Sequence, residues 1–131
     1  MVEVVAEPHP KHIPHFAVAA LDGRVIRYQE LWQRRNLVLV LAAADEHDAA
    51  MTYASTLQAL HNEFEEAETT VVVTTDLVRG LPSPAAIVAD RWGEILHIET
   101  PTADEQSRFP DVEELLAWIQ FARIQCPECP P

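Results

Sequence analysis

The sequence feature that most constrains the fold is a run of five apolar residues, Leu-Val-Leu-Val-Leu, at residues 37–41. A continuous run of this length is typical of a strand that is buried on both faces. Apolar residues spaced three and four apart follow it and predict one long amphipathic helix, before a second β-branched run at residues 70–75. Strand, helix and strand form a βαβ unit, so we expect the two strands to be parallel. The predicted apolar stripe of the helix comprises Ala50, Tyr53, Ala54, Leu57, Leu60 and Phe64.

Two predicted β-hairpins flank this unit. Residues 16–28 alternate between apolar and polar side chains around an Asp22-Gly23 turn, which is typical of a hairpin. A short helix is expected after it, at residues 29–34. The second hairpin pairs residues 85–89 with residues 94–98, across an Asp-Arg-Trp-Gly turn.

The ends of the chain differ from this pattern. Residues 1–15 contain three prolines and three histidines, a composition that favours an extended arm packed on the domain. In an extended arm, histidines three apart stand roughly 9 Å from each other, which disfavours chelation of one ion. Asp111 is predicted to begin the last helix, with Glu114 as its partner in a capping box. We therefore expect one domain at residues 16–125, followed by a tail at residues 126–131.

Composition narrows the classes of function. The chain has 131 residues, 48% of them hydrophobic, which suits one compact domain. Its formal net charge of -12 repels phosphate backbones and anionic lipid surfaces, so nucleic acid and membranes are not expected as partners. The first residues show no signal-peptide pattern, which predicts a cytoplasmic protein.

The order of these elements resembles the peroxiredoxin-like branch of the thioredoxin superfamily, which includes the alkyl hydroperoxide reductases and thiol-specific antioxidant proteins. Three segments carry the resemblance: "PHFAVAALDGRVIRYQELWQRRNLVLVL", "SPAAIVADRWGEIL" and "FPDVEELLAWIQF". It implies a thioredoxin-like α/β fold, with a central mixed β-sheet flanked by helices and an N-terminal β-hairpin. It also implies that Pro84 follows a cis peptide bond and faces the active-site region.

The family's chemistry depends on a cysteine at the start of the helix that follows the central strand, where backbone N–H groups stabilise the thiolate. Residues 42–49 contain no cysteine, so a peroxidase mechanism cannot be assigned to them. Asp45, Glu46, His47 and Asp48 stand there instead, and we treat them, with Pro84, as a converted active site. Asp45 and Asp48 suit helix capping, and with His47 they also suit metal or acid–base chemistry.

Both cysteines of the chain lie in the tail, as Cys126-Pro-Glu-Cys129. They follow a helix C-terminus and flank Glu128, a negative environment that opposes thiolate formation and fast peroxidase chemistry. Slower exchange with a thiol or disulfide of a partner protein remains open to them. Cys-Pro-x-Cys also supplies half of a zinc site, which a His or a second copy of the chain could complete in a homodimer.

The sequence therefore predicts a thiol–disulfide redox role for Cys126 and Cys129, with no cofactor. Two alternatives stay open. One is a non-catalytic binding module that recognises a protein or peptide at the converted site and Pro84. The other is a structural zinc site built from the cysteine pair.

Overall fold

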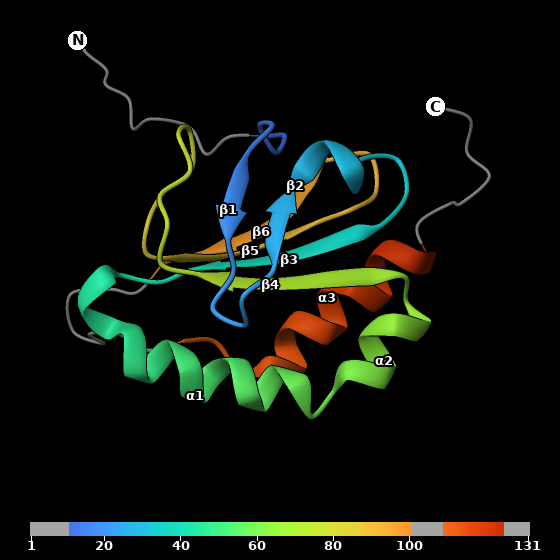
Figure 1. The fold of residues 1–131 in the computed structure, drawn as a ribbon. Coiled ribbons are helices and arrows are strands. Elements are labelled where there is room, and N and C mark those ends of the chain that lie inside the picture. The colour runs from blue at the N-terminus through green and yellow to red at the C-terminus, as the bar shows by residue number, and fades with distance from the viewer. Residues whose placement is uncertain (1–10, 101–108, 125–131) are drawn as a thin grey trace, which may run out of the picture.

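The computed structural model describes residues 11–100 and 109–124, and its centre is a mixed four-stranded sheet (Figure 1). The strand order is β4-β3-β5-β6, with β3 and β4 parallel and the other two pairs antiparallel. The parallel pair confirms the predicted βαβ unit. The strands are β3 (Asn36–Leu41), β4 (Thr69–Thr74), β5 (Ala85–Ala89) and β6 (Ile95–Glu99).

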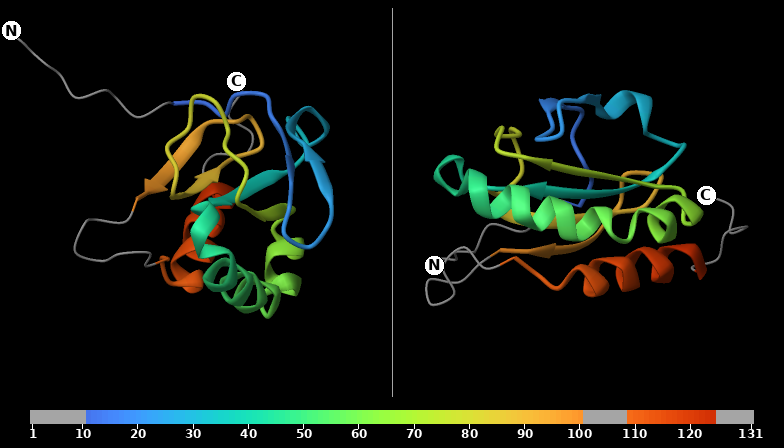
Figure 2. Two further views of the ribbon diagram at one scale, coloured as in Figure 1. Left: turned by 60° about the vertical axis from the view of Figure 1, so that its left-hand side comes forward. Right: turned by 60° about the horizontal axis from the view of Figure 1, so that its bottom comes forward.

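The two faces of this sheet are covered differently. Helices α1 (His47–Gln58), α2 (His61–Glu66) and α3 (Val112–Ile124) lie on one face, and the hairpin β1 (Ala17–Ala19) and β2 (Val25–Arg27) lies over the other (Figures 1 and 2). Strand β3 contributes to both cores. Val38 and Val40 pack in the helix-side cluster, while Leu37, Leu39 and Leu41 pack beneath the hairpin. All five side chains are fully buried, which confirms the expectation for this run.

The first hairpin forms as predicted. Val18 pairs with Ile26, and both side chains face the core. The turn uses Gly23 at φ +97, a left-handed conformation that suits glycine. The short helix expected at residues 29–34 is smaller, because only a 3₁₀ turn at Tyr28–Glu30 forms. Leu31 N–H and Trp32 N–H both donate to the carbonyl of Tyr28, which closes this turn.

The prediction of a single long helix after β3 is wrong, because the chain forms two helices there, α1 and α2. Leu60 leaves the helical conformation, with φ -104 and ψ 20, and its N–H donates to the carbonyl of Leu57 in a tighter step. The apolar stripe survives the break, since Leu57 and Phe64 are both buried in the same cluster. Two short helices can therefore follow the twist of the sheet with one continuous apolar face.

The last helix begins close to the predicted residue. Asp111 Oδ1 accepts a hydrogen bond from Glu113 N–H at 3.2 Å, as expected of a capping side chain. The prediction of a capping box is wrong, because the Glu114 carboxylate does not turn back to the helix start. It lies 3.9 Å from His97 Nε2 on β6. Asp111 thus caps the helix and leaves Glu114 directed at the sheet.

Tyr53 connects α1 to the start of α3. Its hydroxyl donates a hydrogen bond to the carbonyl of Pro110 at 2.5 Å. Burial, followed by the negative charges of Glu99, Asp111 and Glu114, raises the pKa of Tyr53. The hydroxyl therefore stays protonated and remains a donor over the physiological range. In the described part of the chain, no helix has the length and apolar character needed to cross a membrane.

Candidate functional site

The region predicted to be a converted active site lies where β3 ends and α1 begins. Ala42 is buried, and its N–H donates to the carbonyl of Thr74 at 2.9 Å, which extends the pairing of β3 with β4 by one residue. A 3₁₀ turn at Ala44–Glu46 then leads into α1 at His47. No thiol is present at this helix start, so no nucleophile of the peroxiredoxin type can form there.

Asp45 and Asp48 do not cap this helix. The N-cap of α1 is Glu46, without a hydrogen bond from its side chain to the helix, so the expected capping by Asp45 and Asp48 is wrong. Asp45, His47 and Asp48 are exposed, and Glu46 is half-buried. Within the described ranges, this patch does not include a group of three converging metal ligands. Its carboxylates still lie at the positive end of the helix dipole, where each contributes about 0.3–1 kcal/mol.

Pro84 lies next to this helix start. Leu41 pairs with Ala85 across β3 and β5, so the residues before β5 run beside Ala42 and Ala43. The Ser83-Pro84 peptide bond is cis, which confirms the prediction. Ser83 is exposed and Pro84 half-buried. The structure thus brings together the two parts of the converted site that the sequence predicted.

This arrangement combines an exposed acidic patch with an accessible backbone segment. Because its charges are negative, the patch repels anions and favours cationic or polar ligands. The missing thiol removes covalent redox chemistry from this position. The patch therefore suits cationic ligands better than anions, and it has no group for thiol chemistry.

A second candidate site is a hollow of about 580 Å³ beside β4. Asn36 N–H donates to the carbonyl of Glu68, and Ala42 N–H donates to the carbonyl of Thr74. The backbone groups of the even-numbered residues of β4 therefore point toward β3. The carbonyls of Thr69, Val71 and Val73 therefore face away from β3, toward the hollow.

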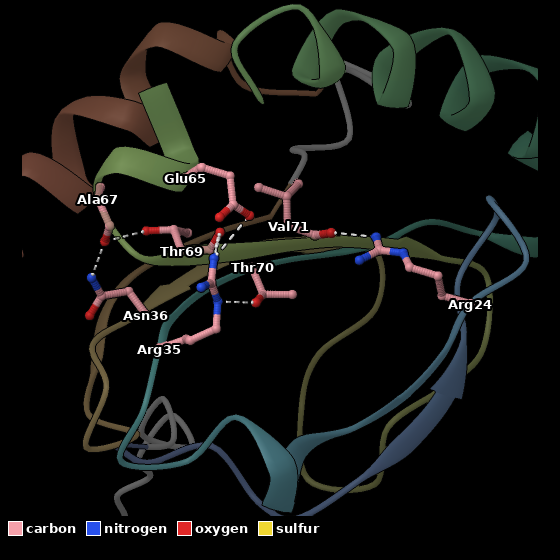
Figure 3. A network of polar contacts seen from close by, with 8 residues as sticks. All are labelled: Arg24, Arg35, Asn36, Glu65, Ala67, Thr69, Thr70 and Val71. Carbon is pink, nitrogen blue, oxygen red and sulfur yellow. Dashed lines mark hydrogen bonds and ion pairs between the residues drawn. The ribbon is translucent and has the colours of Figure 1, made fainter. Parts of the chain in front are cut away.

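Two arginines and one backbone amide cover these carbonyls. Arg35 donates to the carbonyl of Thr69 at 2.9 Å, and Arg24 donates to the carbonyl of Val71 at 2.9 Å (Figure 3). Leu21 N–H, from the first hairpin, donates to the carbonyl of Val73 at 2.8 Å. These donors occupy the outer edge of β4, so the three carbonyls that face the hollow already accept hydrogen bonds.

The charges in this hollow are also paired. Arg24 lies 2.7 Å from Asp22, and Arg35 lies 3.1 Å from Glu65. Neither arginine was among the site residues predicted from the sequence. The only signal was their position, directly after a hairpin turn and directly before the central strand. Such a pattern does not show which strand edge an arginine will reach.

The tail cysteines and the histidines of the N-terminal arm are the remaining residues considered for metal or redox chemistry. Cys126 and Cys129 lie outside the described residues, as does His9 of the N-terminal arm. The described end of the arm lies against the domain. The backbone of His12 forms an isolated antiparallel β-bridge with Glu94, and the ring of His15 lies near that of Tyr28. Neither His12 nor His15 belongs to a converging group of metal ligands within residues 11–100 and 109–124.

No known sequence family matches the chain, and no curated protein sequence matches it. Its fold, however, is similar to solved structures. One is the mitochondrial 2-Cys peroxiredoxin of Plasmodium falciparum, with a TM-score of 0.67 and 12% identity over 92% of this chain and 98% of that one. Another is peroxidoxin BcpB of Mycobacterium tuberculosis, with a TM-score of 0.59 and 14% identity over 84% and 94% of the two chains.

A third similar structure is a thiol:disulfide interchange protein of the thioredoxin family from Chlorobium tepidum. Its TM-score is 0.57, with 11% identity over 89% of this chain and 99% of that one. At such identities the likeness concerns the fold. The predicted thioredoxin-like, peroxiredoxin-like fold is therefore confirmed.

Proposed function

We propose that the protein takes part in thiol–disulfide exchange through Cys126 and Cys129, carried by a thioredoxin-like domain. One observation supports this above the others. The fold is shared with peroxiredoxins and a thiol:disulfide interchange protein, while the helix start at His47 carries no thiol. The chain's two cysteines stand instead at a Cys-x-x-Cys spacing in residues 126–131.

The proposed reaction transfers two electrons. The thiolate of one cysteine attacks a disulfide of a partner protein and forms a mixed disulfide, releasing one partner thiol. The second cysteine then attacks the mixed disulfide and releases the other partner thiol. The pair is left as a Cys126–Cys129 disulfide, which a thiol reductant returns to the dithiol. Glu128 and the acidic chain oppose thiolate formation, so this exchange should be slow.

The experiment is an insulin-reduction assay with the full chain and dithiothreitol. Turbidity should appear faster than with dithiothreitol alone, and a Cys126→Ser/Cys129→Ser variant should lose the acceleration. Mass spectrometry of the oxidised protein should show the loss of two hydrogens in the peptide that holds both cysteines. Equal rates for the two proteins would refute the redox proposal.

A second candidate function is recognition of a protein or peptide at the converted site. The observation that favours it is the position of exposed Ser83 and half-buried Pro84 beside a helix start that has no thiol. The acidic patch at residues 45–48 suggests a cationic partner. Binding of a fluorescent lysine-rich peptide should weaken in an Asp45→Asn/Asp48→Asn variant and stay unchanged in the double serine variant. The opposite pattern would place recognition in the tail.

The zinc alternative for Cys126 and Cys129 is tested on the same proteins. Wild type and the double serine variant, both purified without chelator, should contain the same amount of zinc. The two proteins should also have the same molecular mass in solution. Stoichiometric zinc lost on their replacement would favour a structural site, shared between two chains if a dimer dissociates. We also propose a cytoplasmic location, where such pairs are kept reduced.

A further inference from the structure

A histidine and two glutamates converge at the junction of β6 and α3, away from the converted site. His97 Nε2 lies 3.2 Å from Glu99 Oε1 and 3.9 Å from Glu114 Oε2. One ligand atom from each residue lies within 4.8 Å of the other two. This is the one such group among residues 11–100 and 109–124.

The sheet register sets the position of two of these residues. His97 pairs with Val88, and Glu99 pairs with Ala86, so both side chains project toward the helix-covered face. A register shift after Val88 leaves Leu96 without a direct partner on β5. The pairing is regular from His97 to Glu99, so these two residues, which are two apart on one strand, share that face.

Helix α3 supplies the third carboxylate and fixes the imidazole. The ring of His97 stacks on Trp118, with centroids 4.8 Å apart and planes 12° apart. Trp118 lies four residues after Glu114, so both project from one face of the helix. One helix face therefore holds the ring plane and places a carboxylate near Nε2.

The two carboxylates lack other cationic partners. Within the described ranges, neither Glu99 nor Glu114 forms an ion pair with lysine or arginine, and His97 is the shared partner of both. A protonated imidazole would neutralise one of the two charges. A divalent cation would neutralise both and use all three ligand atoms.

We propose that His97, Glu99 and Glu114 bind one divalent transition-metal ion, with water completing the coordination. Ligands about 2.05 Å from zinc at the tetrahedral angle stand about 3.4 Å apart, and the two observed separations from Nε2 bracket this value. One imidazole and two carboxylates are ligands that zinc accepts. The side chains are 22%, 39% and 47% exposed, which leaves room for entry of the ion and for a water ligand.

The test uses the full chain with Cys126→Ser/Cys129→Ser, so that the cysteine pair cannot contribute. Titration calorimetry with zinc chloride should show one equivalent bound. His97→Phe keeps an aromatic ring against Trp118 but removes the ligand nitrogen, and Glu114→Gln removes one charge. Each change should weaken zinc binding by at least about tenfold, as expected for the loss of a ligand.

The matched control is His61→Ala, because His61 is an exposed histidine at the start of α2, close in sequence to the carboxylates of that helix. This control, and a His12→Ala/His15→Ala variant, should keep full affinity. Circular dichroism should confirm that every variant is folded. The proposal is wrong if the parent binds no zinc, or if folded His97→Phe and Glu114→Gln proteins bind it as tightly as the parent. Loss of binding in either control would assign the ion to a different set of histidines.

Discussion

The hydroxyl of Tyr28 lies directly against the backbone of Gly93. A Cβ atom placed on Gly93 would stand 2.9 Å from this oxygen. Tyr28 follows the first hairpin and is almost fully buried, whereas Gly93 is in the turn between β5 and β6. The contact therefore joins the N-terminal hairpin layer to the turn between β5 and β6.

Replacing Gly93 with alanine should destabilise the protein by about 1–3 kcal/mol, because Gly93 has a φ of +83 and no room for a methyl group. The matched control is Gly23→Ala, at a φ of +97 with no atom within 4 Å of the added Cβ. This control carries only the conformational cost. Urea unfolding should show a larger loss for Gly93→Ala, and equal losses would mean that the contact with Tyr28 has no energetic role.

Replacing Tyr28 with phenylalanine should change stability at high pH. The hydroxyl is buried and has no hydrogen-bond partner among the described residues. Burial, and secondarily the charge of Asp90, raises the pKa of Tyr28 from 10.0 to about 12. Since the pKa is higher in the folded state, stability is intact below pH 10 and falls as the pH rises toward 12.

Urea unfolding at pH 8 and pH 11 measures this effect. Tyr28→Phe should be close to wild type at pH 8, because the lost group makes no hydrogen bond. It should lose less stability than wild type between the two pH values. A parallel decline in the two proteins would show that Tyr28 ionises equally in the folded and unfolded states.

Replacing Arg35 with glutamine should cost about 1–2 kcal/mol. Its guanidinium donates to Thr70 Oγ1 at 2.7 Å, to Glu65 at 3.1 Å and to the carbonyl of Thr69 at 2.9 Å. Arg34 is the control, since it is exposed and makes no side-chain hydrogen bond among the described residues. Arg34→Gln should stay within about 0.5 kcal/mol of wild type in thermal unfolding.

Replacing both cysteines with serine should leave the melting temperature within about 2 °C of that of the oxidised wild-type protein. A bond that closes so short a loop constrains the folded and unfolded chains almost equally. Differential scanning calorimetry of both proteins measures the difference. A large drop accompanied by loss of bound zinc would contradict the redox interpretation of Cys126 and Cys129.

The protein should not reduce hydrogen peroxide at an appreciable rate, because the start of α1 carries no cysteine. A coupled assay with dithiothreitol should give the same rate for wild type and the double serine variant. Turnover in wild type that disappears in the variant would mean that the tail cysteines are far more reactive than their acidic surroundings suggest.

The parts of the fold that could be predicted are those with a local signal. The apolar run of β3 and the Asp22-Gly23 turn predict a buried strand and a hairpin, and both form. The break at Leu60 had no such signal, because no proline or glycine lies near it. The break keeps Leu57 and Phe64 in one buried cluster, so the apolar periodicity runs across it without a change.

The candidate sites divide in the same way. Pro84 was placed through its family resemblance, and the cis bond follows that expectation. The group of His97, Glu99 and Glu114 joins a strand with a distant helix, so no sequence spacing could reveal it. Capping was assigned to Asp45 and Asp48 because acidic residues before a helix usually cap it, but α1 begins at His47, and its N-cap is Glu46.

The covered edge of β4 limits how this domain can assemble. A strand from a second molecule can join a sheet only where backbone carbonyls are available to accept its N–H groups. At β4, guanidinium groups of Arg24 and Arg35 already occupy those of Val71 and Thr69. An incoming strand would have to displace both cations and leave Asp22 and Glu65 without their partners. Fibril-like growth and strand exchange through β4 are therefore energetically opposed by side chains rather than by shape.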